Sequence, residues 1–347
     1  PSQYTSVRLG EFPNPNVGWE KAKKLNLGAD LSFFNQLNIS VDYFKENREG
    51  IFLQRKSIPM YVGLSTKPWV NIGKMRNSGI DASLEYHQPL GKDLHLTVRG
   101  NFTYARNRIM DQDEPDYAYT YMNRSGQMQW QKFGLVAVGL FQDQEDIDSW
   151  TKQSFGEVKP GDIKYLDLNG DGIVDSYDTK PIGYSDIPEI VYGFGFSLQW
   201  KAFDLSAFFQ GVAHVNFSTL TDQTQAFVGR NLKESSVFAD LYGNTWTPEN
   251  PGAKYPRMTT GAVDNNNQLS TFWMADGRYL RLKNLELGYT LPKRIANKIA
   301  MQNLRVYLSG VNLFTFSPFK LWDPDLQTGA TNYPNNRIIN LGLTIGF

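Results

Sequence analysis

The sequence predicts an all-β fold, namely a transmembrane antiparallel β-barrel with long loops on one side of the membrane. Apolar and polar residues alternate with a period of two along most of the chain, which indicates strands that have one apolar face. Several of these alternating segments are 9 to 15 residues long. Short and long connections follow one another along the sequence, which is typical of membrane barrels.

The alternating segments pair into four hairpins that are followed by one last strand. In the fourth hairpin the apolar positions change parity between Leu282 and Leu285, which predicts a β-bulge near residues 283–284. The predicted strands cover 25–33 with 37–43, 80–86 with 94–104, 190–200 with 205–217, 279–291 with 304–316, and 339–347.

Strand length separates a barrel from a soluble β-sandwich, which the alternation alone does not. Strands of globular proteins are usually about 5–6 residues long, whereas a tilted strand that crosses a bilayer needs about 9–11. The aromatic content of 14% also favours the barrel. Charged residues occupy the polar face, which lines a wet lumen in a large barrel; these are Asp30, Asp42, Asp81, Glu85 and Arg99.

The connections between hairpins are long and are expected to lie outside the membrane. They are rich in Gly, Asn, Asp and Pro, as in "WDPDLQTGATNYPNN". The predicted strand number is about nine, and an antiparallel barrel of a single bacterial chain has an even number. We therefore expect this chain to form part of a barrel whose other strands lie outside this sequence. The long connections are 45–78, 106–189, 218–271 and 317–337.

Composition and motifs exclude several classes of protein. The 35 basic and 35 acidic residues balance, so no general affinity for nucleic acid is expected. The chain has no cysteine, which excludes disulfides, thiolate zinc sites and cysteine nucleophiles. It also has no HExxH, GxSxG or P-loop motif, and the sparse His87, His95 and His214 are best explained as solvated residues. We therefore expect no enzyme.

The segment "DLNGDGIVDSYD", residues 167–178, fits the calcium-loop pattern D-x-[DN]-x-[DN]-G. Its closing residue departs from that pattern, since Asp178 is shorter than the usual Glu, and no amphipathic helix flanks the segment. A solvated acidic turn is the alternative. We expect a structural calcium ion that closes a long loop with little core of its own. The predicted ligands are Asp167, Asn169, Asp171, Ile173, Asp175 and Asp178.

Aromatic residues provide two further expectations. Phe347 ends a strand whose apolar residues alternate to the last position, which resembles the C-terminal signature read by the barrel-assembly machinery. Tryptophans in the long loops can either stack on sugar rings or pack in a loop core, and both readings stay open; they are Trp130, Trp150, Trp246 and Trp322.

Blocks along nearly the whole chain resemble one family, and they occur in that family's order. They are "NPNVGWEKAKKLNLGADLSFF", "RNSGIDASLEY", "PGDIKYLDLNGDGIVDSYDTKPIG", "FDLSAFFQG", "NTWTPENPGAKYPR", "GRYLRLKNLELGYTLP" and "VYLSGVNLFTFSPF". Together they are similar to the SusC/RagA-like family of TonB-dependent outer-membrane transporters. The resemblance is weakest across 107–132 and 218–240.

The resemblance implies that residues 1–347 form the C-terminal part of a 22-stranded barrel in the outer membrane of a Gram-negative bacterium. An extracellular loop region at about 107–189 would carry the calcium-loop motif, and the plug domain and TonB box are absent from this sequence. The implied partners are a SusD-like surface lipoprotein, the TonB complex through the missing N-terminal part, and outer-membrane lipid. The implied function is import of glycans or peptides. The alternative is a barrel that serves as a structural or assembly scaffold.

Overall fold

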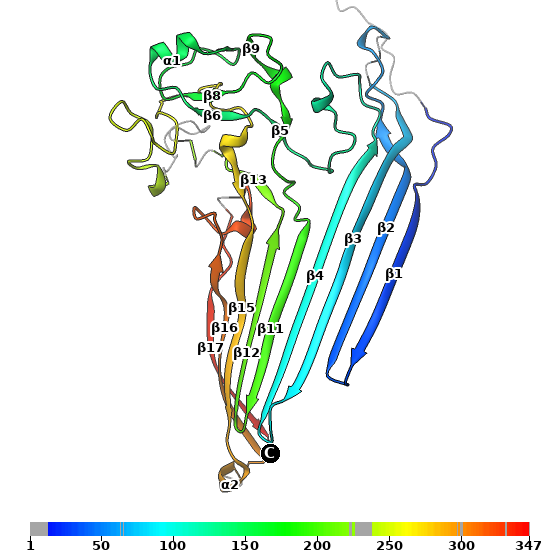
Figure 1. Ribbon diagram of the computed structural model, residues 1–347, viewed down its shortest axis with the longest axis vertical. Helices are drawn as coiled ribbons and strands as arrows, with labels where there is room; N and C mark the ends of the chain where they lie inside the picture. The colour runs from blue at the N-terminus through cyan, green and yellow to red at the C-terminus, as the bar shows by residue number, and fades with distance from the viewer. Residues whose placement is uncertain are drawn as a thin grey trace, which may run out of the picture.

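The computed structural model describes residues 13–346, except 63, 65, 222–223, 226–237, 297, 299–300 and 330–331. Phe347 lies outside the described residues. One nine-stranded sheet dominates the molecule, and every neighbouring pair in it is antiparallel (Figure 1). Its strands, in spatial order, are β1 (Lys21–Phe33), β2 (Leu37–Gln54), β3 (Trp69–Pro89), β4 (Leu94–Asp111), β11 (Ile190–Trp200), β12 (Phe203–Ala213), β15 (Tyr279–Thr290), β16 (Asn303–Phe316) and β17 (Ile338–Gly346).

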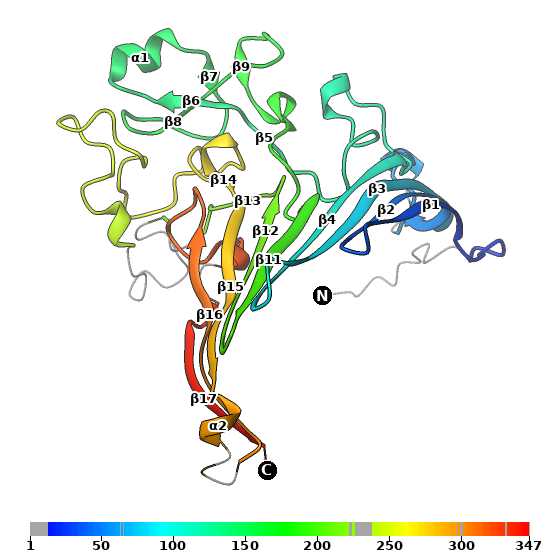
Figure 2. The same cartoon turned by 60° about the horizontal axis from the view of Figure 1, so that its bottom comes forward.

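The four predicted hairpins and the last strand are all present, and the sheet curves along its width (Figure 2). The connection 45–78 was predicted too long, because β2 continues to Gln54 and β3 begins at Trp69. The apolar alternation ends near Tyr43, but backbone pairing continues beyond it with charged residues. Hydrogen bonding between strands does not require an apolar face, so the sheet extends past its apolar part.

The predicted bulge is confirmed in β15. Phe208 of β12 pairs with Asn284, and the next pair is Phe209 with Leu282, so Lys283 is the extra residue. The register against β16 shifts at the same place. An extra residue bends the strand and restores the apolar side chains to one face, which explains the change of parity.

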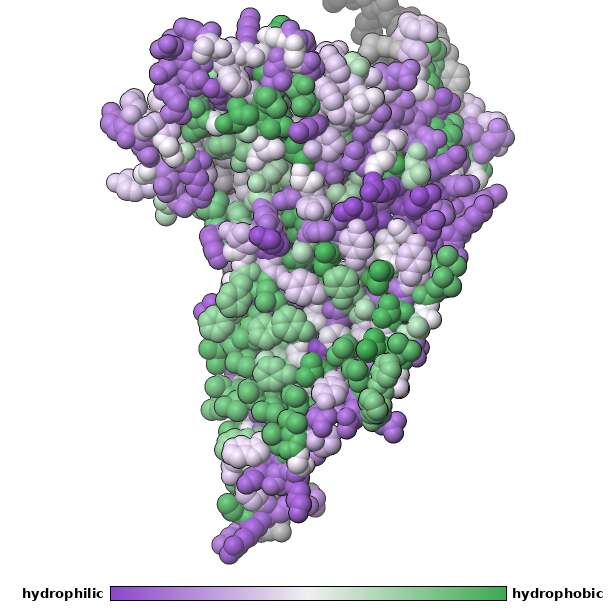
Figure 3. Space-filling view, viewed as in Figure 1, coloured by the Kyte–Doolittle hydropathy of each residue, from purple (hydrophilic) through white to green (hydrophobic). Residues whose placement is uncertain are grey.

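The two faces of the sheet differ in chemistry. Large apolar side chains are exposed on one face, including Leu341 at 78% and Phe316 at 60%, and they form a hydrophobic band along the wall (Figure 3). The other face carries ion pairs between neighbouring strands, such as Arg99 Nε to Glu85 Oε1 at 2.9 Å. In the part of the chain that is described, no helix has the length and apolarity needed to cross a membrane.

Short elements build the connections above and below the wall. Among the described residues, the α-helices are α1 (Gln144–Ser149) and α2 (Lys293–Ala296). The short strands are β5 (Phe133–Gly134), β6 (Ala137–Leu140), β7 (Lys152–Gln153), β8 (Ile163–Tyr165), β9 (Ile173–Val174), β10 (Lys180–Pro181), β13 (Asn216–Ser218) and β14 (Met274–Asp276). The 3-10 helices are η1 (Met60–Val62), η2 (Thr120–Met122), η3 (Ser176–Asp178), η4 (Ala239–Leu241), η5 (Thr271–Trp273) and η7 (Pro324–Leu326).

The arrangement predicts which segments a protease reaches from outside an intact cell. Treatment of cells with proteinase should cut within the connections 107–189 or 218–271, because the described residues of both lie at the loop end of the wall. The short turn "QPLGK", residues 88–92, lies at the opposite end and should be spared, as judged by peptide mapping. Cleavage in that turn from outside would invert this topology.

Candidate functional site: the extracellular loop unit

The largest buried cluster of the described residues lies in the long connections and not in the wall. Leu135, Ile163 and Tyr165 from the connection between β4 and β11 pack with Trp246 and Trp273 from the connection between β12 and β15. The first loop is therefore packed in a core that it shares with the second connection. Both connections contribute buried apolar residues to this one core. We call residues 112–189 together with the described residues of 238–273 the loop unit.

A buried carboxylate joins the two connections of the loop unit. Asp162 is completely buried, and the guanidinium of Arg257 lies against it, with Nε 2.9 Å from Oδ1 and Nη2 3.1 Å from Oδ2. Asn266 donates its side-chain amide to Oδ1 at 2.8 Å, and the backbone N–H of Lys159 donates to Oδ2 at 2.8 Å. A buried charge is tolerated where it is paired and hydrogen-bonded in this way.

A second set of buried amides continues this polar core. Gln153 donates to Asn265 Oδ1 at 2.6 Å and accepts the N–H of Tyr165 at 2.6 Å. The hydroxyl of Tyr165 donates to the carbonyl of Asn265 at 2.8 Å. Burial raises the pKa of Tyr165, so this hydroxyl keeps its proton and remains a donor. Such networks fix one arrangement of a core when their members are satisfied.

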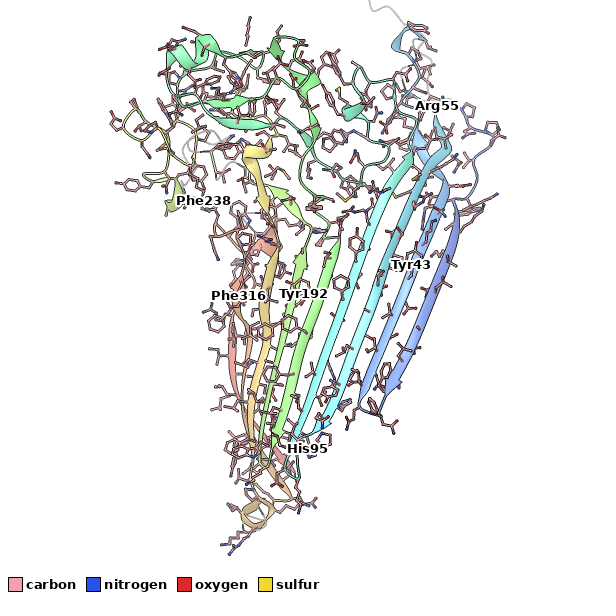
Figure 4. All side chains as sticks on the ribbon, viewed as in Figure 1. Tyr43, Arg55, His95, Tyr192, Phe238 and Phe316 are labelled. Atoms are coloured by element: carbon pink, nitrogen blue, oxygen red, sulfur yellow. The ribbon has the colours of Figure 1, made fainter. Side chains whose placement is uncertain are left out.

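An open cavity of about 570 Å³ lies beside this core, and Phe238, labelled in Figure 4, is one of its lining residues. Its walls combine aromatic rings, such as those of Phe272 and Phe319, with charged side chains. Asp240 accepts hydrogen bonds from Lys254 Nζ at 2.5 Å and from Tyr255 Oη at 2.6 Å. The ammonium of Lys254 lowers the pKa of Asp240, which is therefore ionised at neutral pH. A cavity of this size with apolar walls and a few polar groups is suited to binding an organic ligand.

The structure separates the four loop tryptophans. Trp246 is buried in the loop core. Trp150 and Trp322 donate their indole N–H groups to the carbonyls of Tyr165 and Gln327, so both contribute to packing. Trp130 is 62% exposed and has a positive φ of 66°, which is uncommon for a bulky residue and costs backbone energy. Packing thus accounts for three of the four, and only Trp130 presents a free ring.

The acidic segment 167–178 forms one turn-rich loop whose carboxylates are held by backbone N–H groups. Asp167 accepts from Gly170 and Gly172 at 2.7 and 2.9 Å. Asp178 is fully buried; its Oδ1 accepts from Leu168 and Asn169, and its Oδ2 accepts from Asp175. These hydrogen bonds join residues of the same segment and stabilise its turn.

The remaining predicted ligands lie in the same loop. Asp171 accepts from the N–H of Ile173 at 2.9 Å, and Asn169 accepts from the N–H of Asp171 at 2.9 Å. Asp175 accepts from Tyr177 at 2.7 Å. Within the described ranges, no group of three or more His, Asp or Glu side chains is placed to hold a metal ion. Calcium binding by this loop stays a prediction. In the observed arrangement, the carboxylates of the loop accept hydrogen bonds from backbone N–H groups.

The buried pair predicts a dependence of the loop unit on one residue. Asp162→Ala should remove the buried partner of Arg257, whose side chain is 23% exposed, and should leave the amide of Asn266 without its acceptor, which costs about 3 kcal/mol of local stability, at the low end for a buried pair. Limited proteolysis of the purified protein should then cut faster in 107–189 and in 238–273 together. Glu157→Gln is the matched control, because Glu157 is 82% exposed and its contact with Lys159 is 3.8 Å long. Equal cleavage of Asp162→Ala and the wild type would contradict a shared core.

Calcium binding is tested by calorimetric titration of the purified protein. If the loop is a calcium site, affinity should be weak, on the order of 10⁻⁴–10⁻³ M as in extracellular modules, and Asp167→Ala combined with Asp171→Ala should abolish it. Asp148→Ala removes a carboxylate outside the loop and should change nothing. No heat of binding, together with loop proteolysis that EDTA leaves unchanged, would show that residues 167–178 are only a polar turn.

Comparison with known proteins places this geometry in a family. Residues 2–313 match the family model described as TonB dependent receptor-like, beta-barrel. The chain is 30% identical to TonB-dependent receptor P3 of Formosa agariphila and 26% identical to TonB-dependent receptor SusC of Bacteroides thetaiotaomicron. Both alignments cover 99% of this chain but only 36% and 33% of those relatives, so the chain spans about a third of their length.

The fold agrees with solved structures. The RagAB peptide importer in its open-open state superposes with a TM-score of 0.71 at 22% identity, over 97% of this chain and 36% of that one. A second structure of the RagAB peptide transporter gives 0.71 at 23% identity, over 96% and 36%. The resemblance drawn from the sequence is confirmed, and the protein resides in the outer membrane. The chain belongs to the TonB-dependent receptor β-barrel family and is SusC-like.

Proposed function

We propose that the protein imports bulky nutrients, glycans or peptides, across the outer membrane. A SusD-like surface lipoprotein would deliver them, and the TonB complex would supply energy through polypeptide beyond these residues. Family membership supports this reading, as do the relatives named SusC and the RagAB peptide importer. No chemical step is assigned to the chain, which would act as a wall and a gate for its cargo.

The observation that carries the proposal is the chemistry of the sheet's inner face. Arg305 of β16 forms ion pairs with Asp204 of β12 and with Glu286 of β15, so one arginine links the charged side chains of three neighbouring strands. The opposite face of the same strands is apolar and exposed, as at Leu287 and Leu308. Charged side chains that face a lumen are solvated by water or by a polar transported molecule, whereas the apolar face is covered by lipid. A barrel with such a wall supports passage of polar molecules.

The loop unit supports the same reading from above. Its core is fixed by the pair of Asp162 and Arg257, and its cavity of about 570 Å³ opens beside that core. A loop unit with an amphipathic cavity at the entrance of a barrel is suited to binding a transported molecule before it enters. Lys254 and Asp240 offer both signs of charge to such a ligand.

Growth of a strain that lacks the protein tests import. The strain should fail on at least one bulky glycan or peptide mixture as sole carbon source, yet grow on the corresponding monomers, which do not need a dedicated transporter. Wild-type protein should restore growth only while TonB is present. Normal growth on all bulky sources, together with loss of another outer-membrane complex from the membrane fraction, would favour the scaffold function instead.

A further inference from the structure

A row of basic side chains crosses the outer, lipid-facing side of β1 to β4. The register places Lys23 opposite Asn47, Asn47 opposite Arg76, and Arg76 opposite Arg108. Lys45 lies two residues before Asn47 on the same face of β2. Neighbouring strands are about 4.8 Å apart, so the row is roughly 15 Å wide. We call Lys23, Lys45, Arg76 and Arg108 the basic patch.

The side of the sheet follows from parity along each strand. Tyr43, two residues before Lys45, is 40% exposed, and Ile80, four residues after Arg76, is 42% exposed. Phe102, which shares its parity with Arg108, is 41% exposed. These apolar side chains belong to the hydrophobic band, so the basic patch lies on the face that meets lipid.

The height of the basic patch places it at the border of the bilayer. From Leu37 at the lower turn to Lys45 the chain advances eight residues, or about 27 Å along the strand. A strand tilt of about 40° reduces this to roughly 21 Å, close to the apolar band of about 25 Å in outer-membrane barrels. Figure 3 shows hydrophilic side chains directly above the hydrophobic band over these strands. Tyr43, an aromatic residue of the kind found at membrane interfaces, lies just below (Figure 4).

The basic patch is not neutralised by the described part of the chain. None of its four cations makes an ion pair with a described carboxylate. Arg76 donates a hydrogen bond from Nε to Asn47 Oδ1 at 3.0 Å, and Arg108 donates one from Nη1 to the carbonyl of Gly126 at 2.7 Å. Both acceptors are neutral, so these contacts do not offset the positive charge of either guanidinium. Like charges directly opposite one another on adjacent strands, as Arg76 and Arg108 are, destabilise a sheet unless an anion lies between them.

The next row toward the loops is balanced. There Lys21 lies opposite Glu49, Glu49 opposite Lys74, and Lys74 opposite Asp111. Of these two rows, only the one that borders the hydrophobic band therefore has uncompensated charge. A soluble surface gains nothing from such a placement, whereas a lipid with an anionic headgroup satisfies both features together. Its chains cover the apolar residues and its headgroup neutralises the cations.

We propose that the basic patch binds the phosphorylated headgroup of a membrane lipid in the leaflet on the loop side. Two arginines favour phosphate, because the planar guanidinium binds phosphate oxygens in a bidentate manner. Lys23 and Lys45 flank them and add point charges. The inference depends on residence in the membrane and is independent of what the protein imports.

Native mass spectrometry tests the proposal on the complete protein, reconstituted in phosphatidylcholine nanodiscs that contain phosphatidic acid and then released into detergent. Wild-type protein should retain phosphatidic acid over phosphatidylcholine. The variant Lys45→Gln, Arg76→Gln, Arg108→Gln should retain it about 100-fold less, since each cation near an anionic surface contributes roughly a fivefold factor. The matched variant Lys152→Gln, Lys159→Gln, Lys180→Gln, which removes three cations from the loop unit, should behave as wild type.

Two further arms decide the outcome. Millimolar inorganic phosphate should fail to displace the lipid, and complete displacement would show a free-anion site and overturn the lipid assignment. Equal retention by the triple patch variant and wild type, or equal loss in the loop-unit variant, would overturn the site itself. If the triple variant lacks the heat-modifiability of a folded barrel on a gel, Arg108→Gln alone should still show weaker, more salt-sensitive retention. The growth assay tests import alone, so failure of the import function and failure of lipid binding can be distinguished.

Discussion

Inside a bilayer no water is present to pair with a backbone N–H or C=O, so each strand must find its hydrogen bonds on a neighbouring strand. This requirement explains the antiparallel ladder from β1 to β17, which continues on both sides of the bulge at Lys283 and of the register shifts near Gly50 and Lys74. It also bears on β1 and β17, which are the two edges of the described sheet. Their outward backbone groups need further strands in the membrane, as expected of part of a larger barrel.

The wall and the loop unit are stabilised by different physical effects. The wall exposes its apolar residues, as Leu341 and Phe314 do, because lipid and not protein covers them. Hydrophobic burial within the protein is therefore concentrated above the membrane, around Tyr165 and Trp273. There the molecule behaves as a small water-soluble domain, with a polar core that specifies how the two connections fit.

Sequence reasoning was successful where periodicity carries the information. The hairpins, the bulge and the apolar face followed from alternation, since a strand repeats every two residues. The ends of β2 and β3 could not be predicted in this way, because the apolar alternation stops before the hydrogen bonding does. Recognition of the family depended on several blocks together and not on any single motif.

The loop unit could not be predicted from one sequence. Asp162 and Arg257 are separated by 95 positions, and neither belongs to a periodic pattern, so no local signal links them. The acidic segment 167–178 had a strong local signal, and its turn is indeed compact. That signal cannot distinguish carboxylates that bind an ion from carboxylates that accept backbone N–H groups, which Asp167 and Asp178 do here.

The shared core constrains how the extracellular surface can diversify. Surface loops generally vary in sequence and tolerate insertions more than the strands that they connect. Here the partner of Asp162 is supplied by a different connection, as are several residues of the apolar core. Exchange of one connection with a relative would bury a carboxylate or a guanidinium without its counterpart. The two connections are therefore expected to be inherited as one unit, and recombination that preserves the barrel has to transfer both.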